Sequence, residues 1–143
     1  MTWLLDTNVL SELRKGQRAD AGVRRWFDEA VDRDLFTSVL VVGELRRGVE
    51  SIRRRDRAAA DSLAQWLESL VDRFGERLLP VDAAVASRWG ELNVPNPVPT
   101  VDGLLAATAL VHDLTLVTRN VGDVGRTGAR LLNPFTGRGR RGG

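Results

Sequence analysis

The amino-acid sequence predicts an α/β fold, with a short and mainly parallel central sheet of about five strands and many helices around it. Short apolar segments alternate along the chain with longer segments whose apolar residues recur every three or four positions, the pattern of strands followed by helices. Trp3–Leu5 is apolar throughout, as in a strand buried on both faces of a parallel sheet. A chain of 143 residues fits one domain with a sizeable core.

The first half of the chain is expected to contain two strands. The first ends at Asp6-Thr7-Asn8, and Val9, Leu10 and Leu13 then recur at helical spacing, so this turn joins a strand to a helix. In order, we then expect a helix over residues 20–32, a strand over 35–39, a helix over 41–49, a solvated charged loop over 53–57 and a helix over 58–74.

The second half is expected to contain three more strands, over residues 78–81, 114–118 and 129–132. Asp82 is placed to cap a helix that runs to residue 92, and a proline-rich loop follows at 93–99. A further helix is expected over 101–112, and a Gly-rich connection precedes the last strand. Residues 1–135 should form the domain, and the Gly-Arg tail at 136–143 should be disordered.

Composition excludes several kinds of chemistry. The chain has no cysteine, which rules out disulfides, zinc–thiolate sites and thiol nucleophiles. Its first apolar run is cut off at Asp6, too early for a signal peptide or a membrane span, so a cytoplasmic location is the default expectation. The pI of about 10.3 accompanies a formal charge of only +2, because almost nothing titrates between the carboxylates and arginine. Three positive charges lie in the tail, and subtracting them from +2 leaves −1, so overall charge does not argue for nucleic-acid binding.

Four acidic residues share one kind of position relative to the expected strands. Asp6 ends the first strand, and Glu44 lies in the opening turns of the helix after the second. Asp102 opens the helix before the fourth strand, and Asp123 lies just beyond that strand. In a parallel sheet these strand ends share one edge, where ligands bind in open α/β folds. The four carboxylates are therefore candidates to converge on one site.

Clustered carboxylates favour a hard divalent cation. Neighbouring carboxylates repel one another and raise one another's pKa, whereas Mg²⁺ or Mn²⁺ accepts oxygen ligands and bridges to substrate phosphates. Such an ion lowers the pKa of a bound water and stabilises charge in a phosphodiester transition state. The single histidine, His112, is expected on the surface. Acids without cysteine or a catalytic histidine therefore indicate metal-assisted phosphodiester chemistry.

The same acids also fit purely structural roles. Asp6-Thr7-Asn8 are preferred helix N-cap residues, Glu44 could be a solvated helix position, Asp102 could complement the helix dipole, and Asp123 could be a turn residue. A metal-dependent phosphatase or nucleotide hydrolase is one alternative function, although the sequence contains no P-loop. A non-catalytic module that acts only by binding partners is another.

Four segments in order along the chain resemble the PIN-domain family, in particular the VapC-type toxins of bacterial toxin–antitoxin pairs. They are Leu4-Leu5-Asp6-Thr7-Asn8-Val9-Leu10, Val42-Gly43-Glu44-Leu45-Arg46-Arg47-Gly48, Val101-Asp102-Gly103-Leu104-Leu105-Ala106-Ala107-Thr108-Ala109 and Leu116-Val117-Thr118-Arg119-Asn120, and the closing Asn133-Pro134-Phe135 is also similar. The resemblance spans almost the whole chain. It implies a PIN-like, three-layer α/β/α fold and a Mg²⁺- or Mn²⁺-dependent endoribonuclease that an antitoxin holds inactive and that usually forms homodimers.

The resemblance also implies roles for individual residues. Asp6, Glu44 and Asp102 match the three acidic metal-site positions, with Asp6 and Asp102 as direct ligands and Glu44 acting through a water. The sequence departs from the family at Asn120, where members often place Asp. Asp123, three residues on, is the expected substitute, and a second metal ion is not implied.

Supporting residues and partners follow from the same resemblance. Thr7, Asn8 and Thr118 would support the site by hydrogen bonding. RNA is the expected substrate, with Arg119 or the Arg46-Arg47 pair as candidate phosphate contacts. The apolar stripes of residues 42–49 and 63–71 are candidates for a groove that an antitoxin segment fills, with burial in the core as the alternative.

Overall fold

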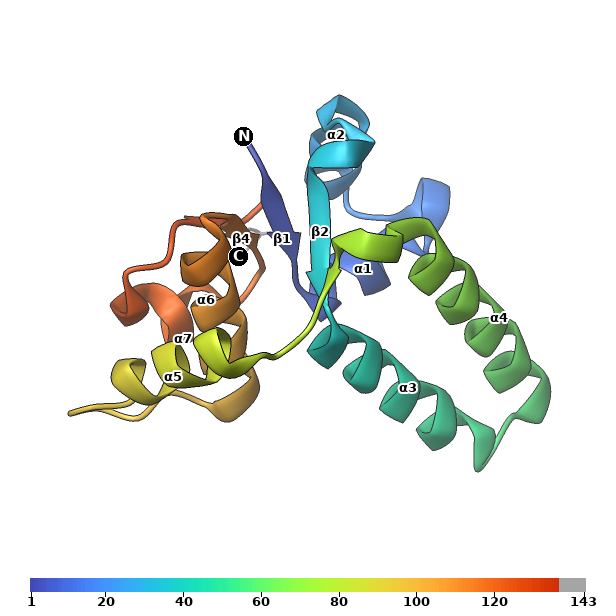
Figure 1. The fold of residues 1–143 in the computed structure, drawn as a ribbon. Helices are drawn as coiled ribbons and strands as arrows, with labels where there is room; N and C mark the ends of the chain where they lie inside the picture. The colour runs from blue at the N-terminus through green and yellow to red at the C-terminus, as the bar shows by residue number, and fades with distance from the viewer. Residues whose placement is uncertain (137–143) are drawn as a thin grey trace.

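A five-stranded, wholly parallel sheet forms the centre of the protein in a computed structural model that describes residues 1–136. The order across the sheet is β3-β2-β1-β4-β5, so the first strand of the chain lies in the middle (Figure 1). This confirms the predicted α/β class and the parallel sheet of five strands. The strands are β1 (Trp3–Leu5), β2 (Leu35–Ser38), β3 (Leu78–Leu79), β4 (Thr115–Val117) and β5 (Leu131–Leu132).

Seven α-helices surround this sheet in the described part of the chain. Figure 1 shows α3 and α4 as a long helical hairpin on one side of the sheet, with α5, α6 and α7 on the other. The helices are α1 (Thr7–Leu13), α2 (Ala21–Glu29), α3 (Val39–Arg53), α4 (Arg57–Phe74), α5 (Ala83–Leu92), α6 (Thr100–His112) and α7 (Val121–Val124). Helices on both faces of a parallel sheet give the expected three layers.

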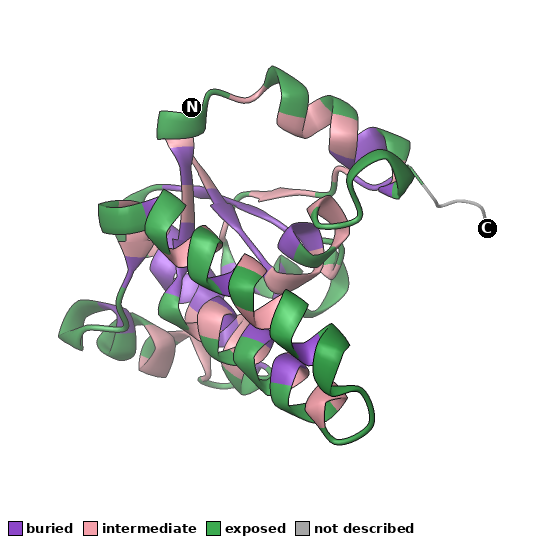
Figure 2. Cartoon of the chain, turned by 90° about the vertical axis from the view of Figure 1, so that its right-hand side faces the viewer, coloured by how far each residue is buried: buried purple, intermediate pink, exposed green. Residues whose placement is uncertain are grey.

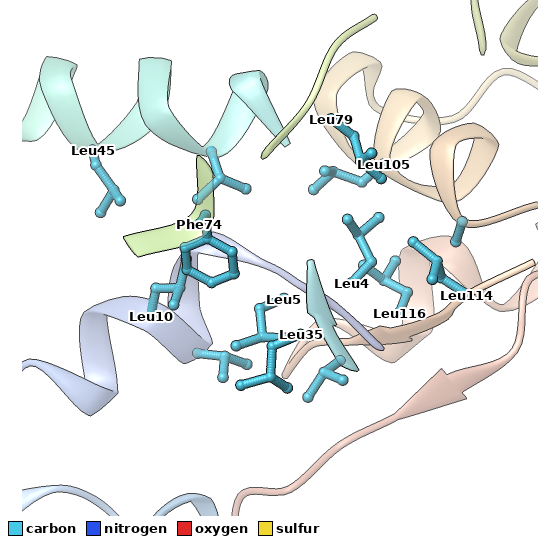
Figure 3. Packing of buried hydrophobic residues seen from close by; sticks show 14 of the residues in the cluster. Leu4, Leu5, Leu10, Leu35, Leu45, Phe74, Leu79, Leu105, Leu114 and Leu116 are labelled. Carbon is cyan, nitrogen blue, oxygen red and sulfur yellow. The ribbon is translucent and has the colours of Figure 1, made fainter. Parts of the chain in front are cut away.

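The core lies on both faces of the sheet because successive side chains of a strand point in opposite directions. Leu4 and Leu5 are both fully buried. Leu4 lies with Leu116 on the side of Leu105 in α6, whereas Leu5 lies on the side of α1 and α4 (Figure 3). Figure 2 shows buried residues gathered on the sheet and on the inner faces of the helices, with exposed residues on their outer faces. Because the central strand β1 is buried, the residue that directly follows it, Asp6, has a fixed place at the edge of the sheet.

The structure differs from the sequence-based expectation at several element boundaries and contains one helix that was not expected. The third helix extends to Arg53 rather than stopping at residue 49, and the expected loop shrinks to residues 54–56. Ile52 packs against the core and Arg53 pairs with Glu50 at 3.3 Å, so the last turn is held in place. The second helix ends at Glu29, and Asp32–Asp34 form a 3₁₀ turn instead. The helix α7 was not predicted at all, because four residues are too few for a helical periodicity to show.

The apolar stripes expected to form either a partner groove or core are core at three positions and half-buried at the others. Leu45, Val49 and Leu67 are buried between α3, α4 and the sheet. Residues 137–143 of the expected disordered tail lie outside the described residues. Thr136 is described, and its backbone N–H and hydroxyl donate to the Asp20 carboxylate at 3.0 and 2.9 Å. Across residues 1–136, the helices are too short or too polar for any of them to cross a membrane.

Candidate active site

Asp6 lies where the central strand β1 turns into α1. Its backbone N–H donates to the Val117 carbonyl at 3.0 Å, which extends the β1–β4 pairing by one residue. Its carboxylate accepts hydrogen bonds from the Thr7 backbone N–H at 2.6 Å and the Thr118 hydroxyl at 2.7 Å. Asp6 is only 6 % exposed, so the residue caps a helix and is also fixed at the edge of the sheet. Helix capping and a role in the site are therefore compatible for this carboxylate.

Glu44 reaches the same edge from a neighbouring strand connection. β2 ends at Ser38, whose hydroxyl caps α3 by accepting from the Leu40 N–H at 3.0 Å. Glu44 follows early in that helix, and the Thr7 hydroxyl donates to its Oε1. A hydrogen bond across 37 sequence positions thus joins the first turn of α1 to α3.

Asp102 and Asp123 approach from the other side of β1. Asp102 is in the first turn of α6, and Asn120 immediately precedes α7. The Asn120 Nδ2 donates to Asp102 Oδ2 at 3.0 Å and to Asp123 Oδ2 at 3.1 Å. One amide therefore bridges two carboxylates that the sequence proposed as site residues.

Three of the four acids line one pocket of about 310 Å³ at the carboxyl end of the sheet. Its lining consists of Asp6, Thr7, Asn8, Glu44, Arg47, Asp102 and Asn120. The fourth acid, Asp123, is exposed and outside this lining, and contacts the site through Asn120. The structure thus brings Asp6, Glu44, Asp102 and Asn120 together, with Asp123 beside them. His112, at the end of α6, is exposed as expected and absent from the lining.

This fold and this arrangement match a known family. The PIN domain family model matches residues 3–122. The chain belongs to the PIN-domain family. Toxin FitB of Neisseria gonorrhoeae is 33% identical to it over 138 residues, covering 92% of this chain and 97% of the relative. The VapC ribonuclease Y4jK of Sinorhizobium fredii is 29% identical, covering 92% of this chain and 96% of the relative.

Solved structures support the same assignment. The crystal structure of FitAcB from Neisseria gonorrhoeae has a TM-score of 0.85 and 32% sequence identity, and the match covers 93% of this chain and 98% of that chain. A structure of FitAB bound to an IR36 DNA fragment has a TM-score of 0.82 and 30% identity, covering 93% and 95% of the two chains. The PIN-like fold expected from the four sequence segments is therefore confirmed over almost the whole chain.

The pocket of this PIN domain concentrates negative charge. Burial raises the pKa of Asp6, and the Glu44 charge adds to this effect, while hydrogen bonds from Thr118 and Thr7 oppose it. Burial also raises the pKa of Asp102, followed by the charges of Asp6, Asp123 and Glu44. In residues 1–136, none of these four acids forms an ion pair with a basic side chain. Among the described residues, no basic side chain therefore forms an ion pair that would relieve the repulsion between these carboxylates.

The donor set suits a hard divalent cation. The acids and Asn120 offer only oxygen ligands, which Mg²⁺ and Mn²⁺ prefer. Within residues 1–136, no three His, Cys, Asp or Glu side chains form a preassembled metal cluster. Mg²⁺ keeps several of its waters and is commonly held by one or two carboxylates. The oxygen-only donor set of the pocket is therefore compatible with Mg²⁺ or Mn²⁺.

Thr118 and Asn8 hold the acids in place. The Thr118 hydroxyl donates to Asp6 and accepts from the Asn120 backbone N–H at 3.0 Å, and Thr118 is 1% exposed. The Asn8 Oδ1 accepts from the Arg119 backbone N–H at 3.2 Å. The same hydroxyl also accepts from the Asn8 Nδ2 at 3.5 Å, and a buried hydroxyl that both donates and accepts fixes the orientation of its partners. The resemblance to the PIN-domain family implied that Thr118 and Asn8 support the site. Only the structure shows which atoms their hydrogen bonds join.

Proposed function

We propose that this PIN domain is a divalent-metal-dependent endoribonuclease and the toxin of a toxin–antitoxin pair. The observation that carries the proposal is the meeting of Asp6, Glu44 and Asp102, from three different elements, around one pocket. The relatives named Toxin FitB and VapC ribonuclease support the toxin and ribonuclease assignments. The cytoplasmic location expected from the sequence stays a prediction.

Each residue has a distinct part in the proposed hydrolysis. Asp6 and Asp102 would hold Mg²⁺ or Mn²⁺, which when bound supplies Lewis acidity and a lowered pKa for water. Glu44, held by Thr7, would accept the hydrogen bond of the attacking water and take its proton. The water oxygen bonds to phosphorus as the ester P–O bond breaks, and the leaving oxygen is protonated from solvent. Asn120 keeps the Asp102 carboxylate oriented and links it to Asp123.

The proposed partners are an antitoxin, RNA and a second copy of the chain in a homodimer. The similar FitAB structure is bound to an IR36 DNA fragment. A candidate surface for an antitoxin segment is a pocket of about 420 Å³ between α1, α2 and α4, lined by both apolar and polar side chains. Its apolar lining is Leu10, Leu13, Phe27, Leu35, Trp66, Leu70 and Phe74. An amphipathic helix is the kind of segment that such a groove receives.

Cleavage of RNA by the purified protein, freed of any antitoxin, tests the nuclease. Total cellular RNA would be incubated with Mg²⁺, with Mn²⁺ and with chelator, beside Asp6→Asn, Asp102→Asn and Glu44→Gln. Glu29→Gln, an exposed acid at the end of α2, is the matched control. We expect discrete fragments that require metal, at least about 100-fold less cleavage by the three site variants, and full activity in the control.

Two contrary results would point to a different function. Intact RNA under every metal condition, from folded protein that still binds a partner, would overturn the nuclease in favour of a non-catalytic binding module. Release of phosphate from a small phosphomonoester without RNA cleavage would favour the phosphatase. Discrete fragments that persist in chelator, or in Asp6→Asn, would exclude the proposed carboxylate site.

A further inference from the structure

Arg47 is the single basic side chain in the lining of the acidic pocket within residues 1–136. It lies on α3 three positions after Glu44, so both residues fall on the same face of that helix. Glu44 does not pair with it but accepts a hydrogen bond from Thr7 instead. The exposed Arg47 therefore lines the pocket without a hydrogen bond from its guanidinium to any of residues 1–136.

The other arginines expected as phosphate contacts are engaged elsewhere. Arg46 pairs with Glu50 at 3.7 Å and lines a different pocket between α3 and α4. The Arg119 Cζ lies 4.0 Å from the centre of the Phe135 ring, which holds that guanidinium against the C-terminal segment. Arg47, in contrast, has neither a hydrogen bond nor an ion pair with any described residue.

An unpaired cation next to an excess of carboxylates indicates a place for an anion. A phosphodiester approaching Asp6, Glu44 and Asp102 carries negative charge into a site that is already negative. A guanidinium at the rim offsets that repulsion, and its planar fork matches two phosphate oxygens. Arg119 is a poorer candidate because the cation–π contact occupies its planar face.

We propose that Arg47 binds a phosphate of the RNA strand beside the metal-binding acids. The inference rests on the proposed nuclease function and assigns one residue of the candidate arginines to substrate binding. Arg47 contacts the strand rather than the reacting water, so its removal weakens substrate capture more than it slows cleavage of bound RNA. A lysine at the position keeps the charge but loses the two-oxygen contact.

The test compares Arg47→Ala and Arg47→Lys with Arg46→Ala, the matched neighbour outside the pocket. Cleavage of a fluorescein-labelled single-stranded RNA is measured with Mg²⁺, and thermal unfolding confirms that each variant is folded. We expect KM to rise about tenfold in Arg47→Ala with kcat changed less than about threefold. Arg47→Lys should fall between the wild type and Arg47→Ala, and Arg46→Ala should match the wild type.

A binding measurement separates this inference from the nuclease proposal. Fluorescence anisotropy of the same RNA is followed on Asp102→Asn and on Asp102→Asn combined with Arg47→Ala, across a series of salt concentrations. We expect about tenfold weaker binding in the double variant. The slope of the logarithm of the binding constant against the logarithm of the salt concentration should become shallower by about 0.7, the value for one lost phosphate contact to a single strand. Equal binding and equal slopes, or an equal loss in Arg46→Ala, would overturn the role of Arg47. Absence of RNA cleavage by the wild type would overturn the nuclease while leaving this binding comparison decisive for Arg47.

Discussion

Asn120 joins Asp102 and Asp123 through a single amide nitrogen, at 3.0 and 3.1 Å. The amide donates to two carboxylates that would otherwise repel each other, and it adds no charge of its own. The PIN domains that this chain resembles often have an aspartate at the Asn120 position. We propose that two residues share the fourth position in this chain, with Asn120 supplying the link and Asp123 the charge. We therefore expect one metal ion rather than two.

Replacing Asn120 with aspartate should make the fold more dependent on metal. Asn120→Asp removes both donated hydrogen bonds and places a third carboxylate against Asp102 and Asp123. Without metal, we expect a loss of about 1 kcal/mol, which lowers Tm by roughly 3 °C for a chain of this size. Mn²⁺ should restore more stability to the variant than it adds to the wild type, because the added oxygen is a potential ligand.

Thermal unfolding across a manganese titration measures this difference. Asn96→Asp, in the exposed proline-rich loop, adds the same charge away from the site and should respond to manganese as the wild type does. An Asn120→Asp protein with unchanged metal-free stability would show that the amide bridge contributes nothing to the fold.

Asp102→Asn should stabilise the metal-free protein while abolishing cleavage. Burial and the charges of Asp6, Asp123 and Glu44 raise the pKa of Asp102. Between the ordinary and the raised pKa, the folded protein binds more protons than the unfolded chain, so the free energy of unfolding falls as pH rises through that window. The asparagine removes this penalty and still accepts from Asn120. We expect a gain of at most about 1 kcal/mol at pH 7, because the group is partly exposed to solvent.

Urea unfolding in chelator from pH 4 to pH 8 checks this expectation. The advantage of Asp102→Asn should shrink as pH falls through the raised pKa of Asp102 in the folded protein, because the wild-type carboxyl gains a proton there. A variant that is less stable than the wild type at pH 7 would mean that Asp102 stabilises the apo fold rather than straining it.

The sequence was sufficient for the sheet and for the positions of the acids. Leu4 and Leu5 are both fully buried, and a short continuous apolar run is typical of a strand covered on both faces. An acid immediately after such a strand must lie at the sheet edge, which is why Asp6 could be placed. Glu44 and Asp102 could be placed in the same way, because each lies early in a helix next to a strand.

Contacts between distant positions could not be predicted. The Thr7–Glu44 bond spans 37 positions, and the bridge from Asn120 to Asp102 spans 18. Periodicity reports which face of an element is apolar, but it does not report which polar atoms meet across elements. For the same reason, the sequence could not show which of the candidate arginines lies near the acids. In the structure Arg47 lines the pocket, whereas Arg119 lies against the Phe135 ring.

Asp20 should stabilise the fold more than an ordinary helix cap. Its carboxylate accepts from the Val23 N–H at 3.1 Å, which caps α2, and from the backbone and hydroxyl of Thr136. Burial alone would raise the pKa of Asp20, but hydrogen bonds from Thr136, Val23 and Gly22 together lower it. Because the pKa of Asp20 is lower in the folded than in the unfolded protein, its carboxylate stabilises the fold above the ordinary pKa of aspartate. This stabilisation is lost as pH falls through the pKa of Asp20 in the folded protein.

Asp20→Ala is compared with Asp82→Ala, which removes only a cap, on α5. We expect Asp82→Ala to cost about 1 kcal/mol, and Asp20→Ala about 2 kcal/mol because it also releases Thr136. The excess should shrink as urea unfolding is repeated at successively lower pH below the ordinary pKa of aspartate. Equal losses at pH 7 would show that the contact with Thr136 adds no stability.

Gly22→Ala should be among the more damaging single-methyl substitutions in the chain. A Cβ at Gly22, in the first turn of α2, would lie 2.3 Å from the Pro134 carbonyl oxygen and 2.4 Å from the Thr136 Cγ2. The first of these neighbours is backbone, so the C-terminal segment would have to move away and break the hydrogen bonds between Thr136 and Asp20. We expect a loss of about 2 kcal/mol in the free energy of unfolding, within the range for overpacked sites.

Gly48→Ala is the control, because nothing lies within 4 Å of the added methyl group in the middle of α3, and alanine there should stabilise the helix by roughly 0.5–1 kcal/mol. Urea unfolding of both variants decides the matter: if they change stability in the same direction, the close approach of the C-terminal segment to α2 does not constrain the fold.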